Sequence, residues 1–295
     1  MTLLVLTAKQ RRIGAHTVDR VLPAIQRRHV GPYIFLDHLG PREQPPGDAF
    51  GVAAHPHIGL STLTYLFEGQ FIHHDSLGNT QPIFPGEVNW MTAGRGITHS
   101  ERVPPDYRGV LHSLQLWVGL TAEHEDTEPT FQHLAGPDLP VVNFDGAVGR
   151  LLAGHAYGQQ SPLRAYSPQF CVDLRLAHGA RVPLPDDHEE RAVYIVEGSL
   201  LVDGAVHDAR RMLVFPAGDA PQLEARTNAT LLLLGGAKIP APHMWWNFVS
   251  TRKDRIEQAR RDWAAGRVFK LPPDDDQEFI PLPDDLPPPR PEPMS

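Results

Sequence analysis

The sequence predicts an all-β protein with two tandem β-sandwich or β-barrel domains, followed by one helix and a proline-rich tail. Short apolar stretches alternate with glycine and proline turns at close intervals, which is typical of sandwiches and barrels. The chain has 295 residues, of which 41% are hydrophobic, and this is sufficient for two domains of ordinary size with a core each. The two halves also repeat a similar order of strands and turns.

Four segments of the first half have the composition of strands. Residues 3–6 predict a short buried strand, and residues 32–39 predict a second strand that ends at the Gly40-Pro41 turn. Residues 60–71 are rich in threonine, leucine and aromatic side chains around a glycine turn, which predicts a hairpin. Residues 111–120 carry bulky side chains on both faces, so we expect a central strand.

A polar, proline-rich stretch at residues 135–140 predicts a domain boundary. We therefore expect a first domain at 1–135, a second at 136–271 and a tail at 272–295. Strands of the second domain are expected at 151–153, 170–176, 192–196, 199–202, 211–215 and 230–234.

The charge of the chain is concentrated in its tail. The net charge is −8, and residues 272–295 hold seven acids and one base, which leaves about −2 for the body. A nearly neutral body without a basic stripe argues against direct nucleic-acid binding. No apolar run approaches the length of a membrane span. Cys171 is the single cysteine, so no intrachain disulfide can form, and we expect a cytoplasmic protein. A nuclear location stays open, although no basic cluster suggests one.

Two short pairs of residues predict a metal site. His55 and His57 are separated by one residue, as are His99 and Glu101. Residues two apart share a face of an extended strand, so each pair points one way. If the two strands meet, three imidazoles and one carboxylate converge, and this donor set suits a divalent transition metal. Four protein ligands on an octahedral ion leave two positions for a substrate or dioxygen.

The surroundings of these pairs resemble a known family. The first histidine pair, a hairpin glycine and a glycine-rich turn before a later histidine resemble the two-part cupin signature. The run from His55 to Glu101 resembles the pirin family, on the segments 55–59, 65–69, 75–79 and 85–101. The resemblance covers roughly residues 30–270. It implies a bicupin, with a metal-binding N-terminal cupin domain and a C-terminal cupin-like domain.

The resemblance also bears on the metal and its ligands. In the common cupin pattern a glutamate ligand lies seven residues before the hairpin glycine, but this chain has Thr62 there. Glu101 supplies the carboxylate instead, as in pirins. The resemblance implies Fe(II). The general order of affinities favours copper or zinc, and nickel and manganese also stay open.

The second half is expected to lack a metal site. Aligning its glycine turns with those of the first half places Leu184, Asp186, Leu223 and Ala225 at the ligand positions. None of them is a histidine or a glutamate. We therefore predict one metal per chain, in the first half. The alternative is that the halves share only a general barrel architecture.

Other polar residues near the motif are interpreted more simply. Asp37 and His38 are taken as surface groups or satisfied core groups, with support of the metal ligands as the alternative. His112 is expected to be a packed core histidine. His73 and His74 are neighbours and must point apart, so both are left out of the site.

Residues 250–266 predict the one clear helix. Thr251 is expected to cap it with Asp254 in the first turn, and Gly266 to end it. Ile256, Ala259 and Trp263 have the spacing of one packed face. The tail after residue 271 is too rich in proline for regular structure, although Phe279, Ile280 and Leu282 could anchor it to the surface.

The resemblance implies quercetin 2,3-dioxygenation, with a flavonol and O2 as the reactants. We expect Glu101 to accept the proton of the flavonol 3-hydroxyl. The alternative function is a non-enzymatic iron-binding or redox-sensing protein that acts through a regulatory protein partner.

Overall fold

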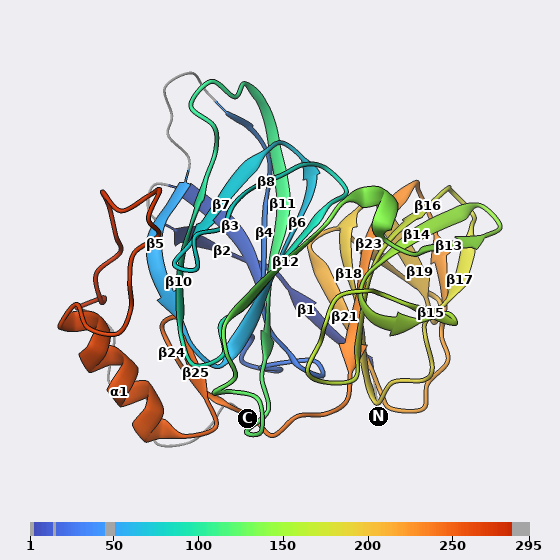
Figure 1. The fold of residues 1–295 in the computed structure, drawn as a ribbon. Coiled ribbons are helices and arrows are strands. Elements are labelled where there is room, and N and C mark those ends of the chain that lie inside the picture. Colours follow the sequence, from blue (N-terminus) through green and yellow to red (C-terminus); the bar gives the residue numbers. More distant parts are fainter. Residues whose placement is uncertain (1–2, 14–15, 45–50, 285–295) are drawn as a thin grey trace. The chain divides into compact units, whose positions relative to one another are not determined.

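The computed structural model describes residues 3–13, 16–44 and 51–284, and nearly all of its regular secondary structure is β-strand (Figure 1). Its contacts divide the chain into two units. Unit 1 contains residues 1–10, 19–36 and 137–239, and unit 2 contains residues 11–18, 37–136 and 240–295. One division falls between residues 136 and 137, and the expected domain bounds stay a prediction. However, unit 1 also takes up residues 1–10 and 19–36, and unit 2 takes up everything after residue 239.

Unit 2 is built mainly on a large and a small antiparallel sheet. The large sheet has the order β12-β9-β6-β11-β4-β3-β2, and the small sheet has the order β5-β10-β7-β8. Strands β2, β3 and β4 include residues of both units. The bounds are β2 Lys9–Ile13, β3 His16–Leu22, β4 Tyr33–Gln44, β5 Gly51–His57, β6 Leu60–Glu68, β7 Phe71–Asp75, β8 Thr80–Ile83, β9 Val88–Thr92, β10 Ile97–Arg102, β11 Gly109–Gly119 and β12 Thr130–Leu134.

Unit 1 repeats this plan. Its large sheet has the order β1-β21-β18-β23-β16-β14-β13, with β15 paired to β14, and its small sheet has the order β17-β22-β19-β20. The bounds are β1 Leu4–Thr7, β13 Val141–Phe144, β14 Ala147–Ala156, β15 Gln159–Gln160, β16 Gln169–Leu176, β17 Arg181–Pro183, β18 Glu190–Glu197, β19 Ser199–Val202, β20 Ala205–Asp208, β21 Arg211–Phe215, β22 Gln222–Ala225 and β23 Ala229–Gly236, with one 3-10 turn at Gly136–Asp138.

The two strand orders correspond one to one, so that β6 matches β18, β5 matches β17 and β10 matches β22. This repetition, which apart from the extra strand β15 gives sheets with the same order of strands, confirms the expected pair of cupin-like barrels. The core of unit 1 is a cluster of aliphatic side chains from both of its sheets. The central strands of both large sheets, among them β6, β18 and β23, are buried on both faces, which agrees with the nearly continuous apolar composition of β18 and β23.

The prediction that this strand ends at Gly40 was wrong, because β4 continues to Gln44. Gly40 has a φ of +78°, and a Cβ on it would lie 2.0 Å from the carbonyl oxygen of Leu111 on β11. The glycine therefore permits a close approach between neighbouring strands, which is a regular use of glycine inside a sheet.

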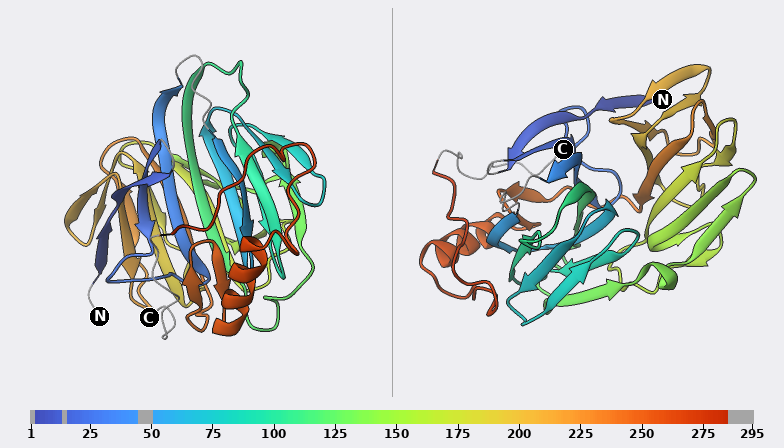
Figure 2. Two further views of the ribbon diagram at one scale, coloured as in Figure 1. Left: turned by 90° about the vertical axis from the view of Figure 1, so that its left-hand side faces the viewer. Right: turned by 90° about the horizontal axis from the view of Figure 1, so that it is seen from above.

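Unit 2 ends in a short hairpin and the helix, with β24 at His243–Trp245, β25 at Phe248–Ser250 and α1 at Lys253–Ala264. The helix lies beside this hairpin (Figure 2). Its buried side chains include Ile256, Ala259 and Trp263, as the spacing predicted. Gly266 follows the helix with a φ of +61°, which confirms the predicted left-handed stop.

The predicted cap was wrong, because the residue before the helix is Arg252 and no side chain caps the first turn. Thr251 donates its hydroxyl to Glu125 over 2.9 Å, and its backbone N–H donates to the same carboxylate over 2.6 Å. The buried Glu125 thus takes up the hydrogen-bonding groups of Thr251. A carboxylate in this position also interacts favourably with the helix dipole.

The described part of the tail contains no helix or strand, as expected, and residues 285–295 lie outside the described residues. The backbone N–H of Ile280 donates to the carbonyl oxygen of Ala54 over 2.8 Å, and Trp263 Nε1 donates to the Ile280 carbonyl over 3.0 Å. Asp275 forms an ion pair of 2.7 Å with Arg102. The tail is therefore anchored beside β5 and β10. Among the described residues, no helix is long and apolar enough to cross a membrane.

Candidate metal centre

The register between β5 and β10 brings three histidines together. His55 lies opposite His99, and Ile97 lies opposite His57, so the three imidazoles point to the same face of the small sheet. One ligand atom from each ring lies within 4.8 Å of those of the other two. The ring centroids are 4.4 Å apart for His55 and His99, 4.9 Å for His55 and His57, and 5.0 Å for His57 and His99. All three side chains are buried.

A glycine after the first histidine pair allows the chain to turn from β5 into β6. Gly59 has a φ of +67°, and a Cβ on it would lie 1.9 Å from the carbonyl oxygen of Val249. Any other residue would be strained there and would push β25 away from the turn. The close packing of this turn helps to hold His57 in place.

The hydrogen bonds of the histidines leave ring nitrogens directed at a common point. His55 Nδ1 lies 2.8 Å from the carbonyl oxygen of Ala53, and His57 Nδ1 lies 3.2 Å from that of Asn247. A carbonyl only accepts, so both Nδ1 atoms carry the hydrogen and each Nε2 keeps its lone pair. His99 Nε2 is buried without a hydrogen-bond partner among the described residues. A buried orphan nitrogen beside two lone pairs fits a metal ligand set.

Burial keeps these imidazoles in the neutral form that binds metals. Loss of hydration lowers the pKa of His55 to about 4, despite the favourable bond to Ala53. The pKa values of His57 and His99 are also lowered well below the usual range, first by burial and then by repulsion between the rings. Protons therefore compete weakly for the nitrogens at neutral pH.

Sequence reasoning left out one residue that the fold places beside the cluster. His73 on β7 is buried, and its Nδ1 lies 3.5 Å from Nδ1 of His99. Its Nε2 lies 3.1 Å from Oδ2 of the buried Asp75. The Asp75 carboxylate accepts a hydrogen bond from His73 Nε2, so His73 Nδ1 is free of hydrogen and can accept a hydrogen bond from His99 Nδ1. The hydrogen of His99 is then on Nδ1, and the lone pair of its Nε2 points to the centre of the cluster. The spacing of His73 and Asp75 on one strand face was the available signal.

Glu101 lies two residues beyond His99 on β10 but is not part of the group of three ligand atoms. The pairing with β5 shifts by one residue between His99 and Glu101, whereas the pairing with β7 continues without a shift. Thr64 donates to Glu101 Oε1 over 3.0 Å. Burial raises the pKa of Glu101, opposed by His73 and the Thr64 bond. Its place as a fourth ligand stays a prediction.

Two further histidines of unit 2, His38 and His112, pair with each other. His38 Nε2 lies 2.8 Å from His112 Nε2, and the two buried rings are stacked at 4.9 Å. Both belong to the core rather than to the group of three, in agreement with the simpler interpretation. Asp37 is also buried.

Three of the four corresponding positions of unit 1 are occupied by apolar side chains, and the fourth is Asp186. Leu184, Leu223 and Ala225 are buried in its aliphatic core, and Asp186 is exposed. Three of the side chains that would have to supply metal ligands therefore fill the barrel instead. This agrees with the prediction that the second half lacks the ligand set of the first.

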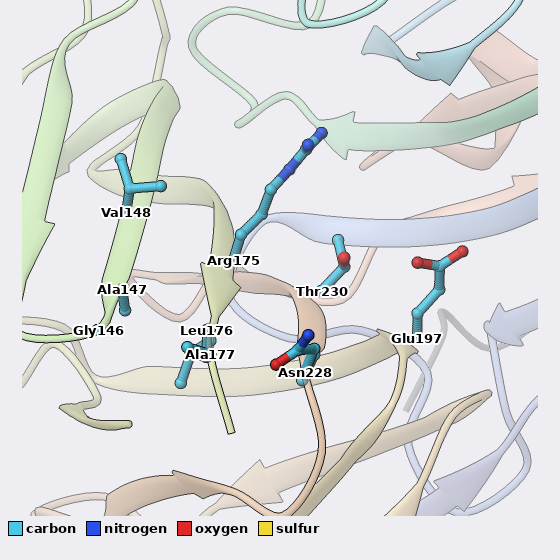
Figure 3. Close-up of a pocket in the computed structure, with 10 residues that line it drawn as sticks. Gly146, Ala147, Val148, Arg175, Leu176, Ala177, Glu197, Asn228 and Thr230 are labelled. Atoms are coloured by element: carbon cyan, nitrogen blue, oxygen red, sulfur yellow. The ribbon is translucent and has the colours of Figure 1, made fainter. Parts of the chain in front are cut away.

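Unit 1 also contains a cavity of about 580 Å3 beside β14, β16 and β23 (Figure 3). Arg175, Glu197 and Asn228 are among its lining residues. None of the predicted metal ligands lines this cavity, because all four belong to unit 2.

Comparison with known proteins agrees with the geometry. Residues 15–118 match the Pirin family model, and residues 171–269 match the model of the pirin C-terminal cupin domain. A pirin-like protein from Caulobacter vibrioides is 47% identical over 95% of this chain and 99% of its own length. A Pseudomonas aeruginosa protein, named only provisionally as a quercetin 2,3-dioxygenase, is 43% identical over 88% of this chain and 83% of its own. The crystal structure of quercetin 2,3-dioxygenase from Acinetobacter baumannii aligns with a TM-score of 0.89 and 34% identity, over 96% of this chain and 97% of that one.

Proposed function

Because the chain belongs to the pirin family, we propose that it is a metal-dependent dioxygenase that opens flavonols such as quercetin with O2. The observation that carries the proposal is the inward group of His55, His57 and His99, with a buried His99 Nε2 that has no hydrogen-bond partner in the described part of the chain. The similarity to the Acinetobacter baumannii quercetin 2,3-dioxygenase over nearly the whole chain supports it.

The three histidines would hold one divalent metal through their Nε2 atoms, and we propose Fe(II). Three neutral imidazoles also suit zinc, nickel and copper, whereas manganese would depend more on the carboxylate of Glu101. When bound, the ion would supply Lewis-acid stabilisation of the substrate oxyanion and a redox-active partner for O2. The protein's contribution is to hold the ligands in fixed orientations, through the carbonyls of Ala53 and Asn247 and through His73.

Glu101 would act as the proton acceptor. Burial raises its pKa, so the carboxylate takes a proton more readily than an exposed glutamate does. Thr64 holds one carboxylate oxygen in place over 3.0 Å. In the proposed reaction the O–H bond of the flavonol 3-hydroxyl breaks and its proton moves to Glu101. The resulting oxyanion ring takes up O2 and opens with loss of carbon monoxide.

The test is anaerobic loading with Fe(II), addition of quercetin and then exposure to air. The measurements are oxygen uptake, carbon monoxide release and metal content. Wild-type protein should consume O2 with quercetin, whereas Glu101→Gln should lose at least about 100-fold in rate, the lower range for a general base. Glu68→Gln is the matched control, because Glu68 is exposed in the same unit.

Two outcomes would count against the proposal. Full turnover by Glu101→Gln with iron retained removes the base assignment. The absence of oxygen uptake on a panel of flavonols removes the dioxygenase. If capture of a protein partner then depends on the oxidation state of the iron, the regulatory function takes its place.

A further inference from the structure

A second group of possible metal ligands lies entirely within unit 1. His155 is the penultimate residue of β14, and Asp187 and His188 lie in the loop between β17 and β18. One ligand atom from each of the three lies within 4.8 Å of the others. The proposed function uses none of these residues.

The distances within this group are those of metal ligands rather than those of hydrogen bonds. His155 Nε2 lies 3.4 Å from Asp187 Oδ2, and His188 Nε2 lies 3.5 Å from Asp187 Oδ1. A good N–H···O bond spans about 2.7–3.2 Å. A tetrahedral zinc ion with bonds of about 2.0–2.1 Å holds its ligand atoms about 3.3–3.4 Å apart. Each oxygen of the Asp187 carboxylate therefore faces one imidazole nitrogen, at about the separation that two ligand atoms of one ion have.

A fourth donor is close to the same point. His188 Nε2 lies 2.9 Å from the backbone carbonyl oxygen of His155. Without a metal, Nε2–H donates to this carbonyl. When Nε2 binds an ion, the hydrogen moves to Nδ1 and the carbonyl oxygen is left beside the ion.

The surroundings combine a rigid side with an open side. The His188 side chain is 2% exposed, and its ring packs on Phe170 with a centroid distance of 4.6 Å. Burial lowers the pKa of His188 and favours the neutral ring. The side chains of His155 and Asp187 are 42% and 47% exposed, so an ion can reach them from solvent.

We propose that His155, Asp187 and His188 form a second divalent metal site, which takes Zn2+ or another late first-row ion. Two imidazoles and one carboxylate prefer these ions over Mg2+ and Ca2+. The ion would join the end of β14 to the β17–β18 loop. This site is separate from Leu184, Leu223 and Ala225, which stand where the first half has its predicted metal ligands. It would add a second metal to the single one that the sequence predicts.

The test counts zinc bound to the chelator-treated full chain by equilibrium dialysis and calorimetry. Wild-type protein should bind two Zn2+ per chain, and His155→Ala should bind one. The double variant His55→Ala/His99→Ala should also bind one, and combining it with His155→Ala should leave none. His178→Ala is the control, because His178 is exposed in the same unit and belongs to neither cluster, and this variant should bind two.

A second readout does not depend on stoichiometry. Zn2+ should raise the Tm of the His55→Ala/His99→Ala variant, and the rise should vanish when His155→Ala is added. Asp187→Asn should weaken zinc binding at least about tenfold, because it removes the negative charge at the site. If the double variant does not fold, the loss of one zinc between wild type and His155→Ala still decides the question. Unchanged stoichiometry in His155→Ala overturns the proposal, as does binding only at millimolar zinc, which means an adventitious ion only.

Discussion

The low pKa of His55 predicts that the metal-free protein loses stability as the pH falls below neutral. The folded-state pKa is about 4, against an ordinary value of 6.5. Between these values the unfolded chain binds the proton and the folded chain does not. Stability due to the neutral ring is therefore complete above pH 6.5, and it is lost progressively as the pH falls from 6.5 to about 4.

The size of the effect follows from the shift. The difference between 6.5 and about 4 is about 2.5 pH units. At about 1.4 kcal/mol per unit, His55 alone lowers the free energy of unfolding by about 3 kcal/mol across this range. The pKa values of His57 and His99 are shifted in the same direction and add to the loss.

The assay is urea unfolding of chelator-treated protein between pH 8 and pH 4, for the wild type and for His55→Gln. Each protein gives a curve of the free energy of unfolding against pH. Subtracting the curve of the variant from that of the wild type cancels the contribution of groups that titrate alike in both proteins. The free-energy difference between wild type and variant should fall by about 3 kcal/mol from pH 7 to pH 4. A difference that stays constant over this range would refute the burial argument.

Three further changes test the metal centre, the core of unit 1 and the turn after β5. His73→Ala should weaken metal binding by about 10–100-fold, because it removes the hydrogen-bond acceptor of His99 Nδ1. The control variant His74→Ala should not weaken it. A competition titration with a chelator measures the metal affinity of both variants. Leu223→Ala should lower the free energy of unfolding, measured in urea, by about 2–5 kcal/mol, because Leu223 is 0% exposed and its truncation opens a cavity in the core. The control Val206→Ala, at a position that is 53% exposed, should change the free energy little. Gly59→Ala should lower the free energy of unfolding by at least about 2 kcal/mol and should reduce the metal content. The reason is that the φ of +67° disfavours a side chain, and an added Cβ would lie 1.9 Å from a carbonyl oxygen. A variant with the stability and metal content of the wild type would contradict this view of the turn.

The sequence by itself determined the strand composition, the repeated halves and the face on which each histidine pair lies. These features depend on local stereochemistry, because successive side chains of a strand alternate whatever the rest of the chain does. The same holds for the buried face of α1, where Ile256, Ala259 and Trp263 follow the helical period. Local rules also showed that no histidine or glutamate stands at the corresponding positions of unit 1.

Only the tertiary structure decided which strands face each other and in which register. The pairing of β7 with β10 brought His73 beside His99, and Glu125 took up the hydrogen-bonding groups of Thr251. The loop after β17 placed Asp187 against His155, 32 positions away in the sequence. Such contacts depend on long-range packing, because the free energy of a buried polar group is set by partners that no local pattern specifies.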